Sequence, residues 1–84
     1  MRGFIGLTRT DLQAKGPYAW TYVTIGPVTL NVDHIVAWLP DVCQWGTVTK
    51  VLTSTGVVYT VLETYGQVGD IILNTLGGSV VKNP

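Results

Sequence analysis

The chain has 84 residues, enough for one small domain that we expect to span residues 1–84. Hydrophobic residues make up 46% of it and charged residues only 12%, about half the charged fraction of a typical soluble domain. The five basic and five acidic residues cancel and are scattered, which excludes the clustered positive charge that a general nucleic-acid binder needs.

The first third of the chain predicts two strands and a long connection. Residues 4–8 predict a short apolar strand, and residues 9–19 a loop that projects from the body, with Gly16-Pro17 as its turn signal. Residues 20–32 are rich in β-branched and aromatic side chains, which is typical of a strand. Because the proline of Gly26-Pro27 cannot donate to a ladder, we expect this strand to be at an edge of the sheet or bulged there.

The middle of the chain predicts three more strands. Residues 34–40 predict a compact apolar strand that Pro40 stops, and residues 41–46 turn the chain. Residues 47–54 and 57–63 flank the sequence Ser-Thr-Gly, in which Gly56 supplies the positive φ of a tight hairpin.

The last third predicts one helix, over about residues 64–76. Thr64 is a suitable N-cap, and Gln67 three residues later completes a capping box. Gly77-Gly78 ends the helix, and the tail over residues 77–84 is either frayed or a short strand added to another subunit. Gly66 and Gly69 weaken the helix, which would be explained by another backbone packing closely there. Four apolar residues share one helical face: Val68, Ile71, Ile72 and Leu76.

These elements predict a mainly β fold, a small antiparallel sheet or partly open barrel of about five strands with one C-terminal helix. Strands and loops take up about residues 4–63. Neither strand of the hairpin over residues 47–63 has a clean polar side, so both faces of the sheet should be covered. One helix covers one face, and the other needs more sheet or a second subunit. Together with the low charge content, this predicts a homo-oligomer.

The order of short motifs along the chain resembles the FlbD family, small proteins of flagellar operons with similar domains in phage genomes. The resemblance covers about residues 5–73 and implies a fold more than a function, because the family offers no established catalytic residues. Its frequency in phages implies a phage accessory protein. The insertion over residues 11–27, the loop over residues 41–46 and the tail depart from the pattern. The matching positions are Leu7, Thr8, Arg9, Leu30, Asn31, Asp33, Ile35, Thr55, Gly56, Val61 and Glu63.

The segment Thr29–Pro40 contains the only histidine, His34, close to Asn31 and Asp33. These three side chains could form a site, or the segment could be a turn between two strands. Asn and Asp commonly bond their own backbone in turns, and the FlbD pattern has both without needing the histidine. We therefore expect a turn, with His34 incidental or at an interface.

Nothing in the sequence assembles a catalytic set. Neither serine has a nucleophile-elbow context, and one histidine beside Asp33 offers too few ligands for a metal. Cys43 and His34 could form a dyad, although a small buried or loop thiol is the simpler interpretation. Cys43 is the only cysteine, which excludes an intrachain disulfide. We expect no enzyme activity, no cofactor and no metal.

Aromatic side chains are the most distinctive feature that remains. Seven Trp and Tyr residues could stack on bases or fill an interface, and Trp38 and Tyr59 are expected in the core. Arg9 and Lys50 are the cations best placed to meet an anion, and Lys50 needs a sheet edge or a negative partner. The sequence leaves open whether the aromatic loops contact ligand or another subunit. The predicted ligand-binding residues are Arg9, Trp20, Tyr22, Trp45, Thr47, Thr49, Lys50 and Tyr59.

The resulting hypothesis is a non-enzymatic, phage-encoded homo-oligomer that sequesters a small nucleotide-like immune signalling molecule in pockets between subunits. The alternative is an interaction or assembly module, FlbD-like or anti-defence, that binds a host protein. No apolar run approaches the roughly 20 residues of a membrane span, and the N-terminus lacks a secretory signal pattern. We expect a cytoplasmic protein, in the host cell if phage-encoded, without membrane or sequence-specific nucleic-acid partners.

Overall fold

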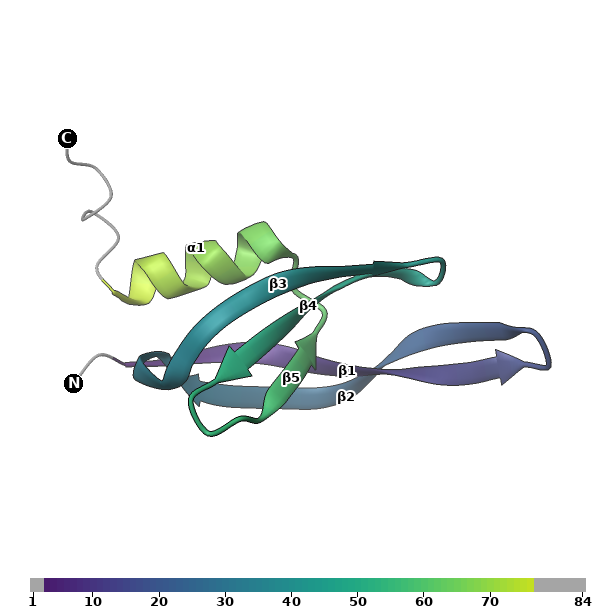
Figure 1. Cartoon of the computed structure of the whole chain (residues 1–84), viewed down its shortest axis with the longest axis horizontal. Helices are drawn as coiled ribbons and strands as arrows, with labels where there is room; N and C mark the ends of the chain where they lie inside the picture. Colours follow the sequence, from purple (N-terminus) through teal and green to yellow (C-terminus); the bar gives the residue numbers. More distant parts are fainter. Residues whose placement is uncertain (1–2, 77–84) are drawn as a thin grey trace.

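The computed structural model describes residues 3–76 and shows one open antiparallel sheet of five strands with a helix packed on it (Figure 1). The strand order is β2-β1-β5-β4-β3. This confirms the predicted mainly β class with one C-terminal helix. In chain order the elements are β1 (Phe4–Gly16), β2 (Ala19–Asn31), the 3-10 turn η1 (Val32–His34), β3 (Ile35–Cys43), β4 (Gly46–Thr53), β5 (Val58–Val61) and α1 (Tyr65–Thr75).

The first hairpin is much longer than the sequence predicts. The expected loop over residues 9–19 is wrong, because β1 continues as a strand to Gly16 and pairs with β2 along its whole length. In the second half of β1 polar and apolar residues do not alternate, so the sequence there gives no strand signal. Backbone pairing with β2 keeps this half extended. The turn at Gly16-Pro17 is confirmed, and the hairpin end does project from the body (Figure 1).

Both edge strands contain a proline. In β2 a register shift lies between the pairs Arg9–Gly26 and Thr10–Thr24, so Ile25 is the extra residue of a bulge, two positions before Pro27. This strand is therefore at an edge and also bulged. In β3 the prediction that Pro40 ends the strand is wrong, because β3 runs on to Cys43. An edge strand tolerates proline because one of its sides needs no ladder.

The turn η1 joins β2 to β3, which are the two outer strands of the sheet. Because only three residues connect these strands, the sheet must curl until its edges meet at this end. The Asn31 side chain accepts a hydrogen bond from the Asp33 N–H at 3.0 Å, and the His34 carbonyl accepts one from the Ser54 N–H at 2.8 Å. The turn interpretation of this segment is confirmed, and the Asn31 side chain bonds the backbone of the turn.

The helix covers one face of the sheet. The Thr64–Gln67 capping box predicted from the sequence is present, with both of its hydrogen bonds. Val68 and Ile72 are buried on this helix and pack into the core. Gly77-Gly78 and the tail lie outside the described residues. The core cluster consists of Ile5, Leu7, Leu30, Val32, Val51, Val61, Val68 and Ile72.

The two helix glycines do not have the close backbone neighbour expected of them. A Cβ on Gly69 would lie 3.5 Å from the indole ring of Trp38, and one on Gly66 would meet nothing within 4 Å. Trp38 is thus held under the helix by a side-chain contact, with its ring 6.1 Å from that of Tyr65. Within residues 3–76, no helix is both long and apolar enough to cross a membrane.

Candidate binding cleft between β1 and β5

The junction between β1 and β5 is the weakest part of the sheet. The two strands share a single pair, Arg9–Val61, followed by a 2.9 Å hydrogen bond from the Leu62 N–H to the Thr8 carbonyl. Beyond Thr10 the strands diverge and leave a cleft of about 310 Å³. The cleft is lined by Arg9, Thr10, Asp11, Ile25, Val57, Val58, Tyr59 and Thr60.

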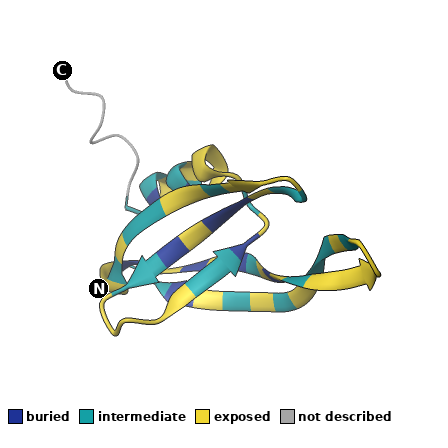
Figure 2. Ribbon diagram, turned by 45° about the vertical axis from the view of Figure 1, so that its right-hand side comes forward, coloured by how far each residue is buried: buried dark blue, intermediate teal, exposed yellow. Residues whose placement is uncertain are grey.

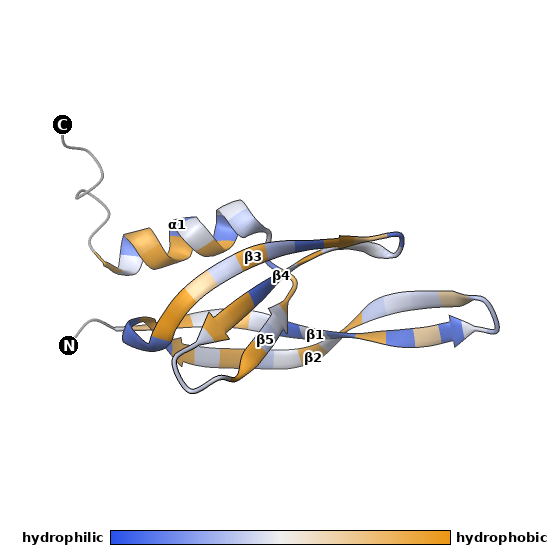
Figure 3. Ribbon diagram, in the orientation of Figure 1, coloured by the Kyte–Doolittle hydropathy of each residue, from blue (hydrophilic) through white to orange (hydrophobic). Residues whose placement is uncertain are grey.

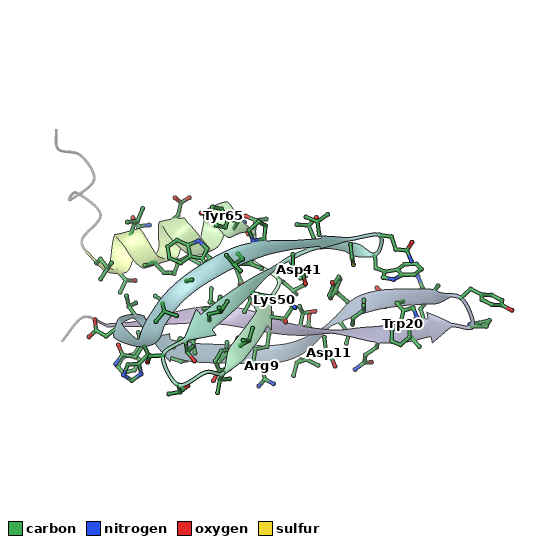
Figure 4. All side chains as sticks on the ribbon, in the orientation of Figure 1. Arg9, Asp11, Trp20, Asp41, Lys50 and Tyr65 are labelled. Carbon is green, nitrogen blue, oxygen red and sulfur yellow. The ribbon has the colours of Figure 1, made fainter. Side chains whose placement is uncertain are left out.

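Arg9 supplies a positive charge to this cleft. Its side chain is exposed, and its guanidinium makes no hydrogen bond or ion pair with any residue that the structure describes. Asp11 follows on the same strand, as Figure 4 shows, and its Oδ1 accepts a 2.9 Å hydrogen bond from the N–H of Leu12. The Asp11 carboxylate therefore bonds a backbone N–H of β1 at a point where β1 no longer pairs with β5. A guanidinium without a partner can bind an incoming anion.

Tyr59 forms the other wall. It is half-buried against the core and pairs with Val51 of β4. It also borders a second hollow, of about 210 Å³. One aromatic residue thus lines two small hollows, and an aromatic side chain there is suited to stacking on a flat ligand. The second hollow is lined by Thr29, Leu30, Asn31, His34, Thr53, Thr55 and Tyr59.

Glu63 fixes the strand that carries Arg9. Its two carboxylate oxygens accept hydrogen bonds from the N–H and the hydroxyl of Thr8, each at 2.9 Å. The carbonyl of Glu63 accepts another from the Thr49 hydroxyl at 2.7 Å. These bonds join β1, β4 and the segment after β5 directly beside the cleft. Thr8 and Glu63 are both positions of the FlbD-like pattern, and here they bond to each other.

The three predicted aromatic loop residues lie away from the cleft, on the projecting ends of two hairpins. Trp20 is close to the tip of the β1–β2 hairpin (Figure 4). The Tyr22 hydroxyl lies 3.4 Å from Cys43 Sγ, which also accepts a hydrogen bond from the Trp45 N–H at 3.4 Å. The two hairpin ends therefore touch through Tyr22 and Cys43.

This contact changes how both side chains titrate. The hydrogen bond with Cys43 raises the pKa of Tyr22 from 10.0 to about 12. The pKa of the Cys43 thiol is lowered below its usual 9.0. The hydrogen bond with Tyr22 is the larger cause, and the hydrogen bond from the Trp45 N–H is the second. The thiol is exposed, so this change affects its reactivity and not the packing of the protein.

The remaining predicted ligand residues are also placed elsewhere. Lys50 forms an ion pair with Asp41, with 3.5 Å between Nζ and Oδ2, so it meets a negative partner within the sheet and is not on an edge strand. Thr49 is fully buried with its hydroxyl already bonded, and Thr47 is exposed on β4. Of the predicted set, only Arg9 and Tyr59 line this cleft. Sequence reasoning missed the contact between Glu63 and Thr8, which depends on how β1 meets β5.

A dyad of Cys43 and His34 is excluded by their positions. His34 precedes β3 and Cys43 ends it, so the nine-residue strand separates them by roughly 25 Å. Within the described part of the chain, no three His, Cys, Asp or Glu side chains gather closely enough to hold a metal ion. Comparison with family models, curated proteins and solved structures finds no match to this chain.

Proposed function

We propose that this protein is a non-enzymatic binding protein that takes a small nucleotide-like anion into the cleft between β1 and β5. The observation that carries the proposal is the position of Arg9, a cation without a partner among the described residues, in the same cleft as Tyr59. Arg9 binds the phosphate, and Tyr59 stacks on the base. Thr60 also lines the cleft, and its hydroxyl is available for a sugar or phosphate oxygen.

Binding without turnover fits this cleft. It offers one cation, one carboxylate and hydroxyl groups, and the ligand leaves it chemically unchanged. In a phage-encoded protein, which the FlbD-like pattern implies, such binding would sequester a nucleotide immune signal of the host. The cleft is open along one side, so a second subunit could complete it, as the expected homo-oligomer requires.

The test is a panel of cyclic and linear nucleotides measured by thermal shift and isothermal titration calorimetry. We expect one class to raise the melting temperature and to be recovered intact after denaturation. Arg9→Gln should abolish this shift, while the matched Lys15→Gln, an exposed cation on the hairpin arm, should keep it. No binding by the wild-type protein would contradict the proposal, and recovery of an altered nucleotide would indicate an enzyme.

A second function is favoured by the end of the β1–β2 hairpin. Tyr18 is 91% exposed and Trp20 is 46% exposed, on an arm that has no core of its own. Exposed aromatic side chains on a projecting element are typical of protein–protein contacts. This supports the interaction module as an alternative, and a Tyr18→Ser/Trp20→Ser variant that loses a host partner but keeps nucleotide binding would separate the two.

A further inference from the structure

One face of the β3–β4–β5 sheet carries exposed apolar side chains and is not covered by helix α1. The register places Ala37, Leu52 and Val58 in one row across the three strands, and Leu39, Lys50 and Thr60 in the next. We call these two rows the Leu39 face. The opposite face contains Trp38 and Val51 and packs against helix α1, so the helix cannot cover the Leu39 face.

The Leu39 face exposes large side chains. Leu39 is 50% exposed and Val58 is 52% exposed, and the neighbouring Val36 is 64% exposed. Figure 3 shows apolar bands on β3, β4 and β5. Val48, further along the same side of β4, is fully buried, so the exposed area ends there. A contiguous apolar patch on so small a domain is typical of an interaction site.

The sheet edges are poorly suited to bind another strand. The free edge of β3 has a register shift at Val36 and contains Pro40, and the free edge of β2 has the bulge at Ile25 and contains Pro27. Bulges and prolines are features that prevent edge-to-edge pairing. A second molecule is therefore expected to contact the face of the sheet and not its edge.

Charge on this face points to a second copy of the same chain. Lys50 belongs to the face, and Asp41, at its border, forms an ion pair with it (Figure 4). The two side chains are 47% and 40% exposed, so each remains open to a further partner. In a twofold arrangement Lys50 of each copy meets Asp41 of the other, and four alternating charges close a ring with none unpaired. A surface that carries both signs side by side is complementary to itself.

We propose that the Leu39 face is the interface of a homodimer, with Leu39, Leu52 and Val58 packed against the same residues of the second copy. Val58 and Thr60 also line the cleft that contains Arg9, so the second copy lies at the border of that cleft. The dimer does not depend on nucleotide binding, because it is carried by the apolar rows and the ion pair alone.

The test uses two single variants of opposite charge. Asp41→Lys leaves only positive charge at the ion pair, and Lys50→Glu leaves only negative charge. By sedimentation-velocity ultracentrifugation, we expect the wild-type protein to be a dimer and each variant alone to have a dissociation constant at least tenfold higher. An equimolar mixture of the two variants should regain a dimer, because each then meets the opposite charge.

Two further variants keep the result interpretable. Lys15→Glu makes the same charge change as Lys50→Glu on the exposed hairpin arm and should leave the dimer intact. Leu39→Glu, also exposed, should give a monomer with unchanged circular dichroism. A monomeric wild-type protein would overturn the proposal, as would single variants that still dimerise alone, or a mixture that stays monomeric while both variants are folded.

Discussion

The two halves of β1 form one continuous strand, yet they have different surroundings. In the first half Ile5 and Leu7 are buried, and the strand is bonded to Glu63 through Thr8. The second half, from Asp11 to Gly16, pairs with β2 alone and is mostly exposed (Figure 2). Backbone pairing is therefore enough to keep a strand extended, while burial decides where stability lies. The candidate cleft is at the boundary between the two halves, where the exposed Arg9 follows the buried residues of β1.

The largest expected effect is a loss of stability on removing a buried side chain from the first half. Leu7→Ala should lower the free energy of unfolding by about 2–5 kcal/mol, because Leu7 is fully enclosed and the change leaves a cavity. Val42→Ala, on a hairpin end where Val42 is 71% exposed, should change it by less than about 0.5 kcal/mol. Urea unfolding followed by circular dichroism measures both, and equal losses would mean that the hairpin ends are packed as tightly as the core.

A smaller effect is expected at the boundary itself. Thr8→Val keeps the shape of the side chain but removes its hydrogen bond to Glu63, and should cost about 1–2 kcal/mol. Because Arg9 is the next residue, the same variant should also weaken binding in the cleft. Thr47→Val, at an exposed position of β4 outside both hollows, is the matched control in unfolding and titration experiments. If Thr8→Val leaves both quantities unchanged, Glu63 does not fix this strand.

The smallest effect concerns the contact between the hairpin ends. Tyr22→Phe removes the hydroxyl that lowers the pKa of Cys43, so that pKa should rise. At a pH below the thiol pKa a smaller fraction is then thiolate, and alkylation by iodoacetamide should become slower, with its pH profile moved upward. Tyr18→Phe, at the tip of the same hairpin, should not move the profile. An unchanged profile in Tyr22→Phe would show that the two hairpin ends are apart in solution.

The sequence predicted those parts of the fold that have local signals. Gly56 has a φ of 91° in the turn between β4 and β5, and Thr64 with Gln67 starts the helix as expected. The sequence predicts a loop for the second half of β1, because polar and apolar residues do not alternate there. The register with β2 that keeps this half extended cannot be inferred from the residues of β1 alone. Pro40 predicts a strand end, because the edge position that tolerates a proline depends on the whole sheet.

The candidate site was predictable only in part for the same reason. The sequence points to Arg9 by its charge and to Tyr59 by its ring, and no local pattern places the two residues in one cleft. The burial of Thr49 beside the exposed Lys50 follows from which face the helix covers. The Lys50–Asp41 ion pair fulfils the expectation that Lys50 needs a negative partner. The pairing of β3 with β4 that brings Asp41 to Lys50 cannot be inferred from the sequence next to either residue.

The three-residue turn η1 has a consequence for how the chain folds. On one side of it lies the β1–β2 hairpin, and on the other the successive strands β3, β4 and β5, each pairing with its neighbour in sequence. Both units consist of short-range contacts and can form early, since little loop entropy is lost. The bonds between Thr8 and Glu63 close a separation of 55 residues. Docking of the two units about η1 is then the late, entropically costly step, and it creates the cleft in the same event that completes the core.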